Sequence, residues 1–260
     1  MVPRITPACQ RLLILSLVLN LVGAAVGGLY AYKTRDVLVG WYAKYVTREP
    51  ARPSPRGRYH RQRVNAFNFL EQTLEGKRLI VFAGDSLIQT FEWGEYFSIP
   101  DSDVVIVNRG IGGDTIDQLI DRSRVTFLGD HGPEKIFIMV GVNDVSEKVG
   151  EEEFSPESVA RKYRALLEAA SAQVAPERIC VHSILPVRGK KAFMNPAIRA
   201  VNTSLESYTN RKGFCYIDAH KKFADATGQL NARYAFEDGL HLSAEGYRLW
   251  LEILTPYVLN

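Results

Sequence analysis

The sequence has few cysteines and almost no excess of charge, and each shortage excludes a class of protein. Its three cysteines, Cys9, Cys180 and Cys215, are scattered, which excludes a disulfide framework and a cysteine-rich zinc site. The net charge of +3 is too small to indicate a nucleic-acid partner, and the basic residues are not interleaved with stacking aromatics. We therefore expect no nucleic acid to bind.

The composition is that of a globular protein. Hydrophobic residues make up 46% of the chain and charged residues 23%, so disorder is not the default. With 260 residues, the chain can hold one domain of ordinary to large size and an appendage. Cys180 and Cys215 fall in predicted strands, where small buried side chains are the simplest interpretation.

The appendage is predicted at the amino-terminal end, where residues 12–32 carry no charge. As a helix this segment would be about 31 Å long, close to the hydrocarbon thickness of a bilayer. A cleaved signal peptide has a shorter apolar region, so we predict an uncleaved single-pass membrane anchor over residues 1–33. Gly23 and Gly27 match the small-residue spacing that lets two membrane helices pair, which suggests a weak homodimer. The flanking charges do not settle the orientation.

A basic linker is predicted over residues 34–62, before a globular domain over residues 63–260. Between positions 48 and 63 there are six arginines, three prolines and a single acid. A solvated spacer is the first interpretation, and contact with anionic lipid headgroups is the alternative. Apolar residues then recur at helical spacing from position 64 to 74, before Gly76. Removing residues 1–62 is expected to leave an active catalytic domain.

Strand-like and helix-like segments alternate through the rest of the chain. Strands are predicted over residues 79–83, 104–107, 136–140, 179–184 and 214–217. Helices are predicted over residues 115–125, 156–174, 196–212 and 244–258, with Ser155, Asn195 and Ser243 as amino-terminal caps of the last three. This alternation predicts an α/β fold with a parallel sheet covered by helices on both faces, whose ligands bind beyond the carboxyl ends of the strands.

The first of these strands leads directly to a candidate nucleophile. Residues 79–87 read Leu-Ile-Val-Phe-Ala-Gly-Asp-Ser-Leu, an apolar run that ends at a glycine, an acid and a serine. A helix starting here would leave backbone N–H groups unpaired around Ser86, a good position for a nucleophile. The plain alternative is that Asp85 or Ser86 only caps that helix.

Three further clusters of polar residues and glycines accompany the serine. They occupy residues 108–115, 141–144 and 238–241. In a parallel sheet, the first two and the serine segment lie at one edge, because each follows a strand. Turn formation or capping explains any one cluster, but their joint presence in this order favours a single catalytic site.

The clusters supply each group that ester cleavage needs. Ser86 is the candidate nucleophile and His241 the candidate base, while Asp238 can orient the imidazole across a tight turn. The oxyanion donors would be the backbone N–H groups of Ser86 and Gly113 and the side-chain amide of Asn143. We expect the rate to rise with pH as His241 loses its proton.

Two other features of the sequence need an interpretation. His220 follows Asp218 and forms a rival pair, although neither a glycine turn nor a capped helix follows it. Arg188, Lys190 and Lys191 form a basic loop after the fourth strand, for which we favour a solvated loop over a contact with an anionic substrate.

Taken together, the four blocks resemble those of the SGNH or GDSL hydrolase family of serine esterases and lipases. The Asn-x-Gly-Ile-Gly-Gly-Asp form of the second block is similar to the branch of the platelet-activating-factor acetylhydrolase catalytic subunits and the lysophospholipase-like enzymes. The resemblance implies a flavodoxin-like α/β/α sandwich without metal or other cofactor. It also implies the roles given above for Ser86, Asp238, His241, Gly113 and Asn143. The adjacent Gly112 leaves the Gly113 assignment open by one residue.

Three functions fit this pattern. The first is hydrolysis of a short-acyl or O-acetyl ester, with a small ester, an acetylated glycan or a lysophospholipid as substrate. The second is O-acyl transfer to an envelope glycan, and the third is a non-catalytic tethered binding module. Because relatives with an amino-terminal span usually act on envelope or secreted substrates, we expect the catalytic domain on the exported side of the membrane.

Overall fold

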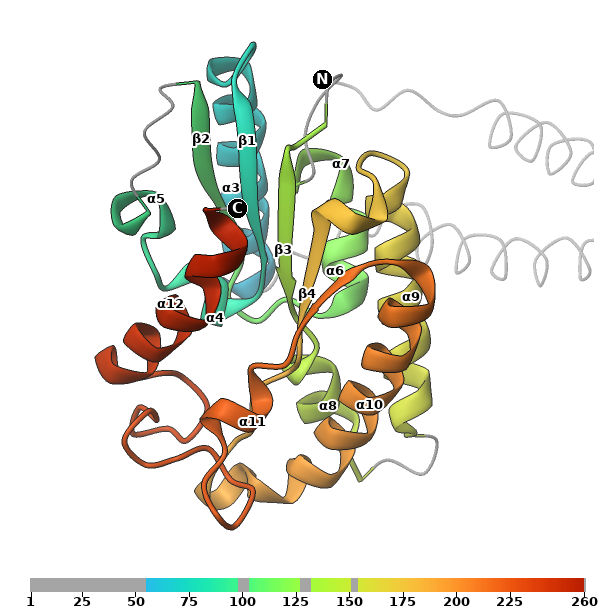
Figure 1. Cartoon of the computed structure of the whole chain (residues 1–260), viewed down its shortest axis with the longest axis vertical. Coiled ribbons are helices and arrows are strands. Elements are labelled where there is room, and N and C mark those ends of the chain that lie inside the picture. The colour runs from blue at the N-terminus through green and yellow to red at the C-terminus, as the bar shows by residue number, and fades with distance from the viewer. Residues whose placement is uncertain (1–54, 98–102, 127–131, 151–153, 260) are drawn as a thin grey trace, which may run out of the picture. The chain divides into compact units, whose positions relative to one another are not determined.

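The computed structural model describes residues 55–97, 103–126, 132–150 and 154–259, in which five strands alternate with helices (Figure 1). The strands are β1 (Arg78–Gly84), β2 (Val104–Gly110), β3 (Lys135–Met139), β4 (Ile179–His182) and β5 (Cys215–Ile217). The α-helices are α3 (Pro55–Thr73), α4 (Ser86–Gln89), α5 (Trp93–Tyr96), α6 (Ile116–Asp121), α7 (Ser123–Thr126), α8 (Val142–Lys148), α9 (Pro156–Ser171), α10 (Asn195–Lys212), α11 (His220–Phe223) and α12 (Ala244–Val258). Two short 3-10 helices are η1 (Pro176–Arg178) and η2 (Gly189–Met194).

The strands form a single parallel sheet in the order β2-β1-β3-β4-β5. The predicted α/β class and the five-stranded parallel sheet are confirmed. This strand order is that of flavodoxin-like folds, in which the chain reverses its direction of winding between β1 and β3. Ligands of such sheets bind outside the carboxyl ends of the strands at that point.

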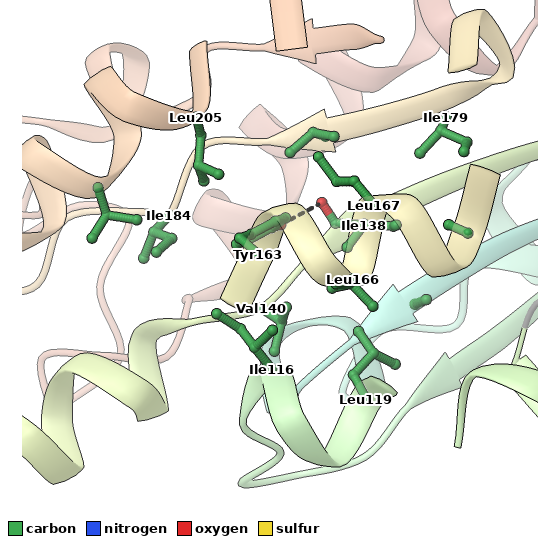
Figure 2. Close-up of a cluster of buried hydrophobic side chains, with 14 of the residues drawn as sticks. Ile116, Leu119, Ile138, Val140, Tyr163, Leu166, Leu167, Ile179, Ile184 and Leu205 are labelled. Carbon is green, nitrogen blue, oxygen red and sulfur yellow. Dashed lines mark hydrogen bonds between the residues drawn. The ribbon is translucent and has the colours of Figure 1, made fainter. Parts of the chain in front are cut away.

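Both faces of the sheet are buried, as the apolar composition of the strands predicted. In β1, Val81 and Ala83 belong to one hydrophobic cluster, while Ile80 and Phe82 belong to the cluster on the opposite face. The first cluster is completed by side chains of α6, α9 and α10 (Figure 2). The second is completed mainly by α4, α5 and α12, where Trp250 is fully buried. The result is three layers, with the sheet between two layers of helices.

The helix that precedes the sheet begins earlier than the sequence predicted. Helix α3 starts at Pro55, so residues 55–62 are helical where a linker was expected. Proline is tolerated there because the first turn of a helix leaves its N–H groups unpaired. The predicted membrane span, residues 12–32, lies outside the described residues, as do the linker up to residue 54 and Cys9. Within the described ranges, no helix is both long and apolar enough to cross a bilayer.

Two helix predictions need correction, and others agree closely. Asn195 does not cap α10, because its side chain instead bonds the backbone N–H and carbonyl of Val187 at 2.9 and 2.8 Å. The helix predicted over residues 115–125 is split at Arg122 into α6 and α7. By contrast, α12 has the predicted bounds, with Ser243 as its cap. Cys180 and Cys215 lie in β4 and β5 as expected, opposite each other in register.

Candidate active site

The serine is delivered by the end of the central strand β1. Gly84 must lack a side chain, because a Cβ atom there would lie 1.9 Å from the carbonyl oxygen of Met139 on β3. Asp85 then caps α4 by accepting a 3.0 Å hydrogen bond from the N–H of Leu87. The capping interpretation is therefore right for Asp85. Ser86 is the first residue of α4, at the carboxyl edge of the sheet.

Ser86, His241 and Asp238 form a continuous chain of hydrogen bonds. The imidazole Nε2 of His241 lies 2.8 Å from Oγ of Ser86, and its Nδ1 lies 2.6 Å from Oδ2 of Asp238. The structure thus brings together three side chains from two distant parts of the sequence. In this arrangement Nδ1–H donates to the carboxylate, which leaves Nε2 to accept the serine proton.

The three-residue spacing between Asp238 and His241 works because a tight turn joins them. Oδ1 of Asp238 accepts hydrogen bonds from the N–H groups of Leu240 and His241, at 3.0 and 2.9 Å. Burial raises the pKa of Asp238, but these bonds and the imidazole outweigh it and hold the pKa at about 2. The carboxylate is therefore charged at neutral pH and keeps the imidazole in one orientation.

The basic loop after β4 supports this turn. The N–H of Arg188 donates to the carbonyl of Gly239 at 2.9 Å, and Nζ of Lys191 donates to the carbonyl of Asp238 at 2.8 Å. A Cβ at position 239 would approach the carbonyl of Arg188 to 2.6 Å, so glycine is needed here for a close approach. This role was not predicted, because the sequence shows only an exposed basic segment.

The hydrogen bonds of the two adjacent glycines favour Gly113 over Gly112 as the predicted oxyanion donor. The N–H of Gly112 donates to Oε1 of Gln89 at 2.6 Å and is therefore occupied. Among the described residues, no acceptor binds the N–H of Gly113 or that of Ser86. Asn143, the second residue of α8, donates from Nδ2 to the carbonyl of Asp114 at 2.9 Å, which ties it to the same loop. An amide nitrogen carries two N–H bonds, so a second donor remains on Asn143.

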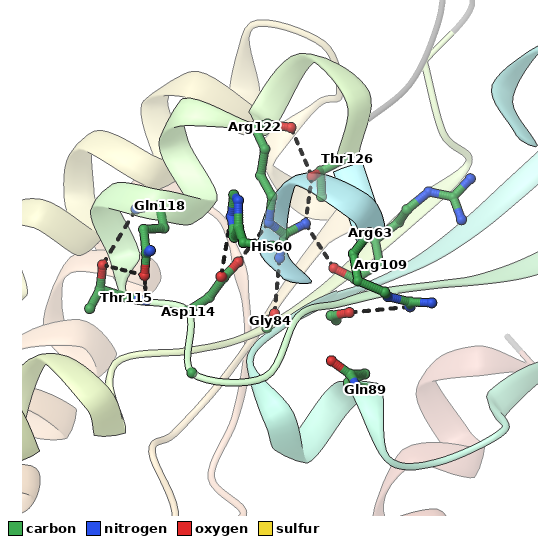
Figure 3. A network of polar contacts seen from close by, with 12 residues as sticks. His60, Arg63, Gly84, Gln89, Arg109, Asp114, Thr115, Gln118, Arg122 and Thr126 are labelled. Carbon is green, nitrogen blue, oxygen red and sulfur yellow. Dashed lines mark hydrogen bonds and ion pairs between the residues drawn. The ribbon is translucent and has the colours of Figure 1, made fainter. Parts of the chain in front are cut away.

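A buried ion pair holds the loop that carries Gly113 (Figure 3). Nε of Arg122 lies 2.7 Å from Oδ2 of Asp114, and both side chains are 2% exposed. The same guanidinium donates to the carbonyls of Arg109 and Gly84, at 2.8 and 3.0 Å. One side chain therefore contacts the ends of β1 and β2 and the loop of residues 111–115, which carries Gly113 and is called the oxyanion loop below. Burial raises the pKa of Asp114, and Arg122 opposes that shift.

Two further buried carboxyl groups surround the serine segment. Burial raises the pKa of Asp85 to about 7 and that of Asp144 to about 6. Asp144 accepts a 2.9 Å hydrogen bond from the N–H of Ile116 and lies 3.7 Å from Nζ of Lys162. Each carboxyl group accepts a hydrogen bond from a backbone N–H at the carboxyl edge of the sheet, that of Leu87 for Asp85 and that of Ile116 for Asp144.

Helix α3 also contacts the oxyanion loop, and the sequence did not predict this contact. Arg56 donates from its guanidinium to the carbonyl of Gly113, and Nε2 of His60 lies 3.4 Å from Oδ1 of Asp114. These residues are four apart and share one helix face. Removing residues 1–62 would delete both contacts and part of α3, and the activity of that shortened chain stays a prediction.

The other described histidines have different surroundings. His220 is 8% exposed, its backbone N–H donates to Oγ of Ser183, and burial lowers the pKa of its side chain. Asp218 pairs with Lys221 at 2.6 Å, so the rival Asp218–His220 pair is not formed. His182 is a buried core residue with a hydrogen bond, because Nε1 of Trp250 donates to its Nδ1 at 3.2 Å.

Comparisons with known proteins agree with this geometry. The model of the GDSL-like Lipase/Acylhydrolase family matches residues 82–249. The alpha2 subunit of platelet-activating factor acetylhydrolase IB from Homo sapiens is 27% identical over 179 residues, which cover 65% of this chain and 70% of the subunit.

Two solved structures share the fold. A GDSL-like lipase from Bacteroides thetaiotaomicron superposes with a TM-score of 0.61 and 20% identity, covering 75% of this chain and 96% of its own. An acetylxylan esterase from Geobacillus stearothermophilus superposes with a TM-score of 0.57 and 17% identity, covering 71% of this chain and 96% of its own. The family model covers more than half of the sequence, including Ser86, Asp238 and His241. The chain therefore belongs to the GDSL-like lipase/acylhydrolase family and is a serine ester hydrolase.

Proposed function

We propose that the protein hydrolyses esters of short acyl groups, acetyl above all, through an acyl-enzyme on Ser86. The observation that carries this proposal is the hydrogen-bonded chain from Ser86 through His241 to Asp238, with distances of 2.8 and 2.6 Å. A nucleophile, a base and an orienting carboxylate within hydrogen-bond reach are the arrangement that activates a serine hydroxyl.

The first half of the reaction forms the acyl-enzyme. Oγ of Ser86 attacks the ester carbonyl carbon while its proton moves to Nε2 of His241. The oxyanion that develops accepts hydrogen bonds from the N–H groups of Ser86 and Gly113 and from the amide of Asn143. The tetrahedral intermediate then collapses, and the leaving alkoxide takes the proton from His241.

The second half releases the acid. A water molecule attacks the acyl carbonyl carbon and gives its proton to Nε2 of His241, while the same donors bind the second oxyanion. Collapse of this intermediate breaks the bond to Oγ of Ser86, which regains its proton from the imidazolium. Asp238 remains a carboxylate throughout and stabilises the imidazolium, consistent with its low pKa.

Two observations support a short acyl group on a large or polar alcohol. The side chains of His241 and Asp238 are 34% and 36% exposed, so the base lies close to solvent, where a bulky alcohol can approach. Relatives of this chain are named as an acetylhydrolase and an acetylxylan esterase, and both names specify an acetyl group. Acetylated glycans are therefore the first substrate class to test, and a lysophospholipid, whose acyl chain is long, provides the contrast.

O-acyl transfer to a glycan is the second candidate for the same chemistry. It requires that a sugar hydroxyl outcompete water for the acyl-enzyme, which depends on excluding water from the site. The exposure of His241 and Asp238 favours hydrolysis over transfer. The complete hydrogen-bonded chain also favours an enzyme over a tethered binding module.

The experiment uses p-nitrophenyl esters of increasing acyl length, together with acetylated xylan and a lysophospholipid. We expect kcat/KM to be highest for the acetyl ester, and activity to vanish in Ser86→Ala. Product analysis with and without a glycan acceptor separates hydrolysis from transfer. A preference for long acyl chains would contradict the short-acyl proposal, and unchanged activity in Ser86→Ala would contradict the mechanism.

For location, we propose that residues 12–32 anchor the protein as a single membrane span with the catalytic domain on the exported side. The uncharged length of this segment supports the anchor. Pairing of two spans through Gly23 and Gly27 would give a weak homodimer. Protease added to intact cells should digest the domain, whereas digestion only after lysis would place the domain in the cytoplasm.

A further inference from the structure

A cavity of about 440 Å³ lies at the open edge of the sheet, beside the oxyanion loop. Its walls come from α3, from residues 106–109 of the edge strand β2, and from Gln89 and Glu92. Ser86 and His241 are not among the lining residues. The cavity is large enough for a small organic molecule.

Two arginines in the cavity wall have buried guanidinium nitrogens for which the described residues supply no hydrogen-bond acceptor. Arg109 is 2% exposed, and its Nε and Nη2 have no partner among the described residues. Its Nη1 reaches only the carbonyl of Asn108, at the long distance of 3.5 Å. Nε of Arg63 is likewise buried without a partner, and its Nη2 reaches the carbonyl of Gly110 at 3.4 Å. Buried donors of a charged group are costly to leave unpaired, so this arrangement favours an added acceptor.

The two guanidinium groups contact the same aromatic ring. Each lies 4.9 Å from the ring centroid of Phe67, the buried aromatic of α3. Figure 3 shows the side chains of Arg63 and Arg109 extending to the same side of the loop. Two guanidinium groups that contact one ring and repel each other are suited to a planar or tetrahedral group with several oxygens.

The charges around the cavity favour one negative charge. Arg63 and Arg109 are positive, Glu92 is negative, and the nearby Glu71 favours the charged form of Arg109. Arg122, also near Phe67, is already paired with Asp114. Burial, followed by the repulsion from Arg63, lowers the pKa of Arg109 to about 10, so Arg109 remains charged at neutral pH. An anion between Arg63 and Arg109 would relieve their mutual repulsion.

We propose that this cavity is a binding site for a carboxylate or phosphate group, held between the guanidinium groups of Arg63 and Arg109. The group belongs to a free small anion or to the head of an amphiphile whose apolar part lies against Leu70 and Leu74. The lining of this site does not include Ser86 or His241. Gln89 connects the site to the oxyanion loop, because it lines the cavity and its Oε1 accepts a hydrogen bond from the N–H of Gly112.

The test uses the full-length protein with Ser86 blocked by a phosphonate, so that anions cannot bind in the oxyanion hole unnoticed. Binding is measured by isothermal titration calorimetry with four probes: inorganic phosphate, acetate, octyl phosphate and octanoate. Saturable binding of at least one probe is expected. Binding by phosphate or acetate indicates a free anion, and binding only by the octyl compounds indicates an amphiphile.

Substitutions of the lining residues test whether the probes bind in this cavity. Arg109→Met and Arg63→Met should each weaken binding about tenfold or more, because each removes charged donors. Glu92→Gln should tighten it, because it removes a negative charge from the wall. Arg61→Met, which changes an exposed arginine of the same helix, should leave it unchanged.

Three results would overturn the proposal: no saturable binding of any probe, equal affinity in wild type and Arg109→Met, or an equal loss in Arg61→Met. Circular dichroism checks the folding of each variant. If Arg109→Met does not fold, Arg63→Met and Glu92→Gln decide, because they must shift the affinity in opposite directions. A shift in the same direction for both contradicts the assigned site.

Discussion

The two halves of the active site are built in different ways. The half that carries Ser86 and the oxyanion loop contains buried ionisable side chains, with Asp85, Asp114 and Arg122 each no more than 3% exposed. The half that carries His241 is an exposed turn, in which the side chains of Asp238 and His241 are about one-third exposed. The first half therefore contributes to the stability of the fold, and the second contributes mainly to the chemistry.

This difference follows from what each half must do. Oxyanion donors must stay fixed while charge develops, and a buried network of hydrogen bonds provides that rigidity. The base must exchange protons with serine, leaving group and water, so a solvent-facing position suits it. Mutations should accordingly separate activity from stability on the histidine side and couple them on the serine side.

The largest expected effect is on the histidine side. His241→Ala should lower kcat by about 10⁴ to 10⁶, because the serine loses its base, with little change in Tm. His220→Ala is the matched control, since His220 is buried away from this chain of hydrogen bonds. Steady-state kinetics and thermal melts of both variants check the prediction. Loss of activity in His220→Ala with normal kcat in His241→Ala would refute the assigned base.

On the serine side, Arg122→Met should lower both stability and activity. It leaves Asp114 buried without its partner, which costs about 3 to 5 kcal/mol. The Tm should fall by about 6 to 20 °C, and kcat should fall because the oxyanion loop loosens. Arg124→Met, an exposed arginine two residues away, serves as control and should behave like wild type. A stable Arg122→Met protein would show that the buried pair does not support this half.

Substitution of Asn143 tests whether catalytic activity and stability can be separated within the half of the site that carries Ser86. Asn143→Ala should lower kcat by about 10² to 10³, or about 2.7 to 4 kcal/mol, with a smaller change in KM. A modest fall in Tm should accompany it, because the 2.9 Å bond to the carbonyl of Asp114 is lost. Asn210→Ala, on the exposed face of α10, provides the control. Normal kcat with a much lower Tm would make Asn143 a structural residue only.

The smallest expected effect is a pH dependence of stability. Burial raises the pKa of Asp85 from 3.8 to about 7, so its contribution to stability is complete below pH 4 and is lost as the pH rises through about 7. Asp85→Asn removes this titration but buries an amide that must itself be desolvated. We expect the variant to gain stability relative to wild type at pH 8 compared with pH 4, because wild type alone loses the contribution of Asp85 over this range. Chemical denaturation at both pH values measures this, and a gain at pH 4 alone would reverse the sign.

The sequence predicted those parts of the molecule that depend on local patterns. Apolar runs located all five strands, and Ser243 located the start of α12. The positions of Ser86 and His241 were also predicted, because each lies in a short motif with glycine.

The missed features depend on contacts between distant residues. Arg122 lies within a helix-like segment, and only the folded chain shows that it bonds Gly84 and Arg109. Asn195 is of a residue type that often caps helices, but its side chain bonds the backbone of Val187 instead. The start of α3 was not predicted, because its prolines and arginines are typical of linkers. Its contacts with the oxyanion loop place it in the domain.

The most direct test of the account is covalent labelling with a p-nitrophenyl phosphonate, followed by peptide mapping. The phosphorus atom is attacked as an ester carbonyl would be, so the label reports the activated nucleophile and does not depend on the natural substrate. We predict one adduct per chain, on Ser86, formed rapidly in wild type and His220→Ala and much more slowly in His241→Ala. An adduct on another residue, or labelling of Ser86 at the same rate in His241→Ala, would contradict the account.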